Sequence, residues 1–76
     1  MKRKIVKILS GIRPEFDFNQ SINFIEAGML DSFDIVRLVT ELDQEFGISI
    51  DGMDILSENF ASIEKIITLL KNKGVR

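Results

Sequence analysis

Residues 31–47 read DSFDIVRLVTELDQEFG, and this stretch decides the fold. Its apolar residues recur at i, i+3, i+4 and i+7 and again one turn later, which places a continuous stripe on one face of an α-helix. Asp31 or Ser32 is suited to cap the start of this helix, and Gly47 is suited to end it in the left-handed conformation. The apolar stripe consists of Ile35, Leu38, Val39, Leu42 and Phe46.

Two further segments, one on each side of this helix, repeat the same spacing. We expect Gly11 and Pro14 to close the first of these helices and Gly74 to close the last, because glycine and proline commonly follow helix ends. Ser62 is suited to cap the start of the last helix. The two stripes are Ile5, Ile8, Leu9 and Ile12, and Ile63, Ile66, Ile67 and Leu70.

The connections between these helices differ in length. The connection over residues 14–31 is long and rich in apolar residues, so we expect an ordered loop packed onto the helices. Residues 48–61 predict an extended piece and then a short helix within 53–60, with Ile55, Leu56 and Phe60 facing inward. The apolar residues of the long loop are Phe16, Phe18, Ile22, Phe24, Ile25, Met29 and Leu30.

The predicted fold class is therefore all-α: a small bundle of three main helices plus one short helix, with a long ordered loop between the first two helices. The 76 residues form a single domain, residues 1–76, and 45% of them are hydrophobic, which is enough for a modest core. We expect the core to include Ile8, Leu9, Leu38, Leu42, Phe46, Ile63, Ile66 and Leu70.

The composition excludes several kinds of chemistry. The chain has no Cys and no His, so it lacks thiol nucleophiles, imidazole bases and the usual zinc ligands. It also lacks a glycine-rich phosphate loop, and we expect neither catalytic residues nor a metal site. No apolar run is long enough to span a membrane, and Lys7, Ser10 and Arg13 interrupt any signal-peptide core. We therefore expect a cytoplasmic protein. We also expect a monomer.

Charge is divided unevenly along the chain. All twelve acidic residues lie within residues 14–64, where Arg37 is the single basic residue, whereas both ends are basic. An acidic centre repels nucleic acid and attracts basic protein partners, so we expect no nucleic-acid partner and no membrane insertion. The basic ends are interpreted as solvated helix faces that offset the acidic centre.

Ser32 stands where the long loop becomes the second helix. A helix N-terminus presents unpaired N–H groups and the positive end of a dipole, which favours a bound phosphate. A phosphate ester on Ser32 is therefore electrostatically favourable there. On the local pattern alone, however, we favour the plainer interpretation that Ser32 or Asp31 serves only as the helix cap.

Several features, taken in order, resemble the acyl carrier proteins and related phosphopantetheine-binding domains over about residues 2–73. The stretch Gly28-x-x-Asp31-Ser32 resembles the attachment motif of that family. The second helix and its end, and the entry to the last helix, also match the family pattern. These matching residues are Leu38, Val39, Leu42, Glu45, Phe46 and Gly47, and then Glu58, Asn59, Phe60, Ala61, Ser62 and Ile63.

The resemblance implies that Ser32 carries 4′-phosphopantetheine, which a separate phosphopantetheinyl transferase takes from coenzyme A. The terminal thiol of the arm then holds an acyl group as a thioester, so the cofactor supplies the sulfur that the chain lacks. It further implies an acyl-loading ligase or transferase and downstream enzymes of fatty acid or polyketide biosynthesis as partners. Asp31 and Phe33 flank the proposed attachment point.

Two residues depart from the family pattern. Phe33 stands where the family usually has Leu, and we interpret it as packing against the loop, although a larger ring could instead narrow an acyl pocket. Arg37 stands where fatty-acid carriers usually have an acid. With Asp34 and Glu41 it forms the predicted partner-binding face, and Arg37 there suggests a dedicated pathway; its plainer role is in two exposed ion pairs with those acids.

Two other functions remain open beside a stand-alone acyl carrier protein without catalytic activity. One is an aminoacyl, D-alanyl or peptidyl carrier that uses the same Ser32 arm. The other is a helical protein-interaction domain that is never modified. Loading assays with candidate ligases distinguish the aminoacyl or peptidyl carrier from the acyl carrier. The absence of any mass change with a transferase would identify the unmodified interaction domain.

Overall fold

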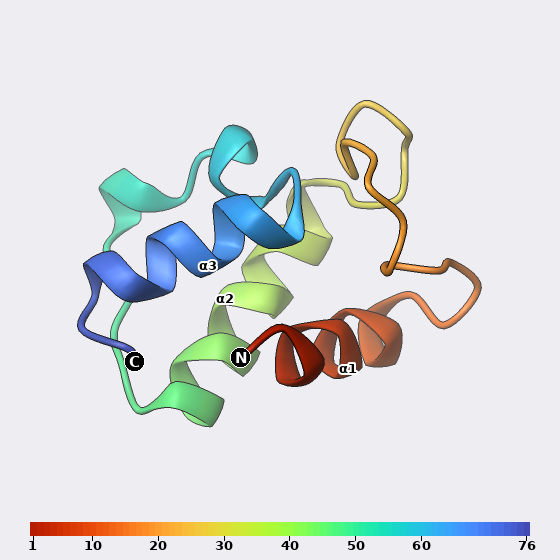
Figure 1. Cartoon of the computed structure of the whole chain (residues 1–76). Coiled ribbons are helices and arrows are strands. Elements are labelled where there is room, and N and C mark those ends of the chain that lie inside the picture. Colours follow the sequence, from red (N-terminus) through yellow and green to blue (C-terminus); the bar gives the residue numbers. More distant parts are fainter.

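A computed structural model describes all 76 residues and confirms the all-helical prediction. Three α-helices, α1 (Lys2–Ile12), α2 (Ser32–Phe46) and α3 (Ile63–Asn72), form the body of the molecule. Two short 3₁₀ turns, η1 (Gly52–Asp54) and η2 (Ser57–Phe60), lie between α2 and α3. Figure 1 shows α2 passing behind α3, while α1 contacts both of these helices and η2 packs against α2 and α3.

The apolar stripes of the three helices meet in one core. Leu38 and Leu42 of α2 are fully buried there, together with residues of α1 and α3. Ile8 and Phe46, which were also expected in the core, are half-buried at its edge. The fully buried core side chains are Ile5, Leu9, Phe18, Phe24, Leu38, Leu42, Phe60, Ile66 and Leu70.

The helix ends agree with the sequence prediction except at the end of α1. Gly47 follows α2 with φ 63°, in the left-handed conformation that glycine adopts without steric cost. Ser62 caps α3, and its hydroxyl accepts a hydrogen bond from the Lys65 N–H at 3.1 Å. The prediction that Gly11 closes α1 is wrong, because the helix continues through Gly11 to Ile12. It ends because Pro14 disfavours helical geometry at the preceding residue.

The long loop between α1 and α2 is ordered by its own apolar residues, as predicted. The rings of Phe18 and Phe24 are fully buried and meet edge to face, with centroids 5.1 Å apart. The Phe24 N–H donates to the Ala61 carbonyl at 2.7 Å, which ties the loop to the entry of α3. Ile22, by contrast, is exposed at the loop surface.

The segment before α3 differs from the predicted short helix. It forms two separate turns, because Leu56 between them has an extended backbone with φ −115° and ψ 140°. Phe60 is buried as expected, but Ile55 and Leu56 are 37% and 48% exposed, so the prediction that they face inward is wrong. The turn η1 is held by Lys73 rather than by apolar packing. The Lys73 Nζ lies 2.9 Å from Asp51 Oδ2 and also contacts the Asp54 carboxylate.

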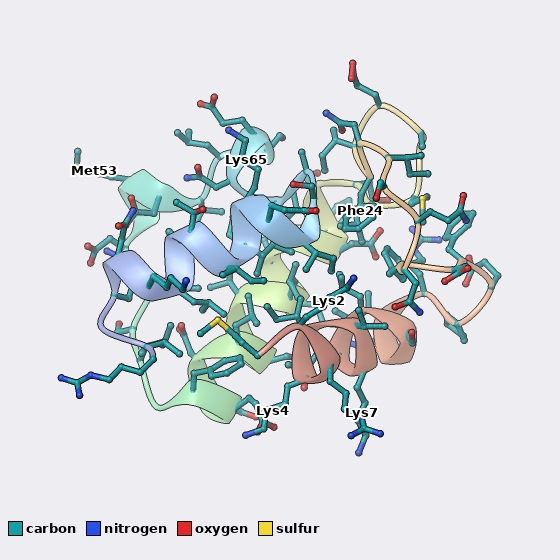
Figure 2. The ribbon with its side chains drawn as sticks, viewed as in Figure 1. Lys2, Lys4, Lys7, Phe24, Met53 and Lys65 are labelled. Carbon is teal, nitrogen blue, oxygen red and sulfur yellow. The ribbon has the colours of Figure 1, made fainter.

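None of the helices has the length and hydropathy of a membrane-spanning segment. Figure 2 shows several charged side chains directed outward, with Lys4 and Lys7 leaving α1 on the side away from α3. Met53 likewise projects from η1 into solvent.

Candidate functional site

The start of α2 is closed by a reciprocal pair of aspartates. Asp31 is the N-cap residue, and its Oδ1 accepts a hydrogen bond from the Asp34 N–H at 3.0 Å. In return, Asp34 Oδ2 accepts a hydrogen bond from the Asp31 N–H at 3.0 Å. This arrangement is a capping box in which aspartate takes the place of the usual glutamate or glutamine. The cap predicted at Asp31 or Ser32 is therefore formed by Asp31.

Ser32 is the first residue of α2 and lies on the surface. Its hydroxyl is not needed for the cap, because Asp31 already performs that role. The hydroxyl is thus an exposed group at the positive end of a helix of 15 residues. An exposed hydroxyl at this position fits a covalent phosphate ester, because the first N–H groups of a helix and its dipole stabilise negative charge.

A tight turn of the loop brings Asp31 and Ser32 to the surface. Gly28 has φ 73°, a left-handed conformation that most other residues adopt only with strain. The chain then folds back, and the N–H groups of Met29 and Leu30 both donate to the Phe24 carbonyl, at 2.9 and 3.3 Å. Met29 and Leu30 are buried. The loop is thereby anchored immediately before the exposed serine.

Arg13, at the end of α1, contacts both aspartates of the cap. Its Nε donates to Asp34 Oδ2 at 2.9 Å, and its Nη2 lies 2.9 Å from the same oxygen. Nη2 also lies 3.3 Å from Asp31 Oδ2, and Nη1 lies 3.4 Å from Glu15 Oε2. Arg13 was not predicted from the sequence to be part of the site. It precedes Asp31 by 18 positions and Asp34 by 21, and contacts over such separations follow no periodic sequence pattern.

These contacts determine the ionisation of Asp34, whose side chain is only 12% exposed. Burial by itself raises the pKa of the Asp34 carboxyl. The hydrogen bonds from Arg13 and from the Asp31 backbone, together with the positive charge of Arg13, outweigh burial and hold the pKa below its ordinary value. The pKa of Arg13 is raised in turn, mainly through its hydrogen bond to Asp34.

Phe33 does not pack against the loop as the sequence analysis expected. Its side chain is 84% exposed, beside Ser32 on the surface of the first turn of α2. Val36, one turn along the same helix from Ser32, is 61% exposed. The physical reason is helix geometry: Phe33 precedes Ile35 by two residues and so lies roughly 160° around the helix from the buried face of α2. The structure therefore leaves an apolar surface next to Ser32.

Arg37 and Glu41 lie on the side of α2 that faces α1. Together they line a groove to which α1 contributes two lysines and Gly11. The expected ion pairs of Arg37 with Asp34 and Glu41 are absent. The Asp34 carboxylate contacts Arg13 instead. The residues of this groove are Lys4, Lys7, Ile8, Gly11, Ile12, Arg37, Glu41 and Glu45.

The three hollows of the surface all lie away from Ser32 and Phe33. One is the groove between α1 and α2, one lies between the loop and the start of α3, and one lies beside the first turn of α1. No hollow opens beside the serine to receive a long apolar group. The alternative role of Phe33, that its ring narrows an acyl pocket, is therefore not supported, because no pocket lies beside it.

Comparison with protein families gives a match over most of the chain. The family model described as phosphopantetheine attachment site matches residues 3–70. Neither the comparison with curated proteins nor the comparison with solved structures gives a significant match. The matched range includes nearly all of α1, the long loop, α2 and most of α3, and so it includes the exposed serine and its aspartate cap.

Proposed function

The chain belongs to the phosphopantetheine-attachment-site family, and on this premise we propose that it is an acyl carrier protein whose arm is attached to Ser32. Members of this family carry covalent 4′-phosphopantetheine and work with a phosphopantetheinyl transferase and with biosynthetic enzymes. The observation that carries the assignment to Ser32 is its exposed hydroxyl at the first position of α2, outside the capping box.

The residues around Ser32 fit a phosphodiester. When bound, the arm supplies a terminal thiol that holds cargo as a thioester, which is chemistry that the chain itself lacks. The helix start stabilises the phosphate through free N–H groups and the dipole, while the Gly28 turn and the cap keep the serine in a defined place. The protein itself binds and presents the arm, and we propose no catalytic role for it.

An apolar acyl cargo is favoured over an aminoacyl cargo by the surface beside the attachment point. Phe33 and Val36 expose apolar side chains there, and burying such surface against an alkyl chain is favourable. No hollow beside Ser32 is available in this structure to take a long chain. We therefore propose that the protein presents its cargo at the surface to partner enzymes.

The proposed partner face lies along α2 next to the arm. Arg37 is exposed there, and Glu41 is half-exposed. Asp34 was expected to contribute to this face. Its Oδ2 atom instead contacts Arg13 and accepts the N–H of Asp31 in the cap, so we propose that it acts by holding the helix start. With Lys4 and Lys7 nearby, Arg37 makes this side of α2 more basic, which supports a dedicated set of partners.

The test of the attachment site is incubation with coenzyme A and a broad-specificity phosphopantetheinyl transferase, followed by intact mass spectrometry. The expected result is the addition of one phosphopantetheine to the wild-type chain and none to Ser32→Ala. Phe33→Ala serves as the matched control, because it removes a neighbouring exposed side chain and leaves the hydroxyl. A wild-type chain that stays unmodified with several transferases would support the alternative of an unmodified interaction domain.

The cargo is tested by loading the modified protein with candidate ligases. Acyl-activating ligases with fatty acids of several lengths form one arm of the assay, and amino-acid-activating ligases, including a D-alanine ligase, form the other. A thioester formed with fatty acids supports the acyl carrier. A thioester formed only with amino acids would assign the aminoacyl alternative.

A further inference from the structure

Arg13 brings a positive charge to a place where the chain already holds two negative charges. Asp31 directly precedes Ser32, and Asp34 follows it by two residues, so both carboxylates flank the proposed attachment point. Arg13 contacts both of them, at 3.3 Å and 2.9 Å. A phosphodiester on Ser32 adds a further negative charge to this cluster, beside the Glu15 carboxylate that Arg13 also contacts.

We propose that Arg13 is the counter-ion of the phosphate attached to Ser32 and thereby positions the base of the arm. This inference rests on the proposed function. Like charges at close range repel, so two unneutralised aspartates would offset the attraction of the helix N-terminus for the phosphate. With Arg13 in place, the cluster has a cation that the phosphate shares with the aspartates.

The contacts of Arg13 differ in a way that suits this role. The link to Asp34 is short, uses two nitrogens and meets a nearly buried carboxylate. The links to Asp31 and Glu15 are longer, 3.3 and 3.4 Å, and meet exposed carboxylates. A guanidinium has five N–H donors, and bidentate contacts to phosphate suit its planar shape. Arg13 can therefore keep Asp34 and turn its outer N–H groups from Asp31 toward a phosphate.

The other nearby cations are less suited to this task. Arg37 follows Ser32 by five residues, which places its backbone about 7.5 Å further along the helix axis, where it lines the groove between α1 and α2. Lys4 pairs with Glu45, in the last turn of α2 and at the opposite end from Ser32. Arg13 is thus the cation that the fold brings to the first turn of α2.

The test compares thermal unfolding before and after phosphopantetheine is attached, in wild type and in Arg13→Gln. Loading is confirmed by mass spectrometry in every sample. We expect loading to lower the unfolding temperature of Arg13→Gln by roughly 2–4 °C more than that of wild type, because the added charge then lacks its counter-ion. Arg13→Lys should recover part of this difference. Lys4→Gln, which removes another α1–α2 ion pair, should behave as wild type does.

A second measurement covers the case in which Arg13→Gln does not fold. In wild-type protein, the Nε–Hε NMR signal of Arg13 should shift on loading more than the corresponding signals of Arg3 and Arg37. A loading effect that is equal in wild type and Arg13→Gln, or an Arg13 signal that does not move, overturns this inference alone. A wild-type chain that gains no mass overturns the proposed function, and this inference with it.

Discussion

Arg13 and Asp34 are 21 residues apart in the chain, and the guanidinium places Nε and Nη2 each 2.9 Å from the same carboxylate oxygen. The same oxygen accepts the Asp31 N–H that closes the capping box. One carboxylate thus joins the end of α1 to the start of α2 across the long loop. Because this carboxylate is nearly buried, the contact is better protected from solvent screening than the exposed ion pairs of the molecule.

Asp31 caps α2 and Ser32 does not, so substitutions at these two residues should have different effects on the free energy of unfolding. Asp31→Ala removes the cap and should lower the free energy of unfolding by about 0.5–2 kcal/mol. Ser32→Ala should change it by less than about 0.5 kcal/mol, because its hydroxyl takes no part in the cap. Urea unfolding of the unmodified proteins measures both values. Equal losses in the two variants would contradict the assignment of the cap to Asp31.

Acid should weaken the fold partly through Asp34. Its pKa is lower in the folded protein than the ordinary value of 3.8, so the fold favours the charged carboxylate. The resulting stabilisation is present above the pKa of the unfolded chain and is lost as the pH falls through the folded pKa. Between about pH 5 and pH 2, wild type should therefore lose more stability than Arg13→Gln, whose Asp34 lacks its main charged partner.

Urea unfolding over this pH series measures the effect. Lys4→Gln serves as the control for loss of one positive charge from α1, and its pH dependence should follow that of wild type. Parallel curves for wild type and Arg13→Gln would show that the Arg13–Asp34 contact does not hold the pKa of Asp34 down.

The buried face of α2 should dominate its contribution to stability. Leu42 is fully buried, and Leu42→Ala should lower the free energy of unfolding by about 2–5 kcal/mol through lost burial and a cavity. Val36→Ala is the matched control on the same helix, and because Val36 is 61% exposed its effect should stay within about 0.5 kcal/mol. Similar losses at the two positions would mean that the buried face is wrongly assigned.

Arg37 should influence partner choice with little effect on folding. It makes no ion pair, so Arg37→Glu should leave urea unfolding nearly unchanged. If Arg37 repels enzymes that bind acidic carrier proteins, Arg37→Glu should raise the rates at which these enzymes modify or load the protein. The increase should arise mainly from faster association and should be largest at low salt. Rates at two ionic strengths measure this effect, with enzymes from general fatty acid synthesis as the probe.

Lys65→Glu is the control for the charge change in this experiment. It alters net charge by the same amount from an exposed position on α3. An equal increase for Lys65→Glu would reflect net charge alone. Unchanged rates for Arg37→Glu at both salt concentrations would remove the basis for a dedicated pathway.

Local pattern predicted the helices and most of their ends. Apolar spacing located all three helices, and Gly47 and Ser62 close their helices as expected, because capping depends on residues close in sequence. The prediction at Gly11 was wrong, since an isolated glycine is tolerated within a helix and Pro14 decides where α1 ends. Ile55 and Leu56 were placed inward on their apolar character alone, which does not determine whether space remains in the core.

The sequence by itself determined the three amphipathic helices, the ordered loop and the position of Ser32 at the start of α2, because each depends on residues within a few positions of one another. Local geometry within the first turn of α2 decided that Asp31 rather than Ser32 forms the cap and that Phe33 is exposed. Only the tertiary structure decided that Arg13 reaches the site and that Asp34 contacts it, because these contacts depend on charges brought together from distant segments. The spacing of residues in the sequence does not give the distance between Arg13 and Asp34, because packing of the helices in the core determines it.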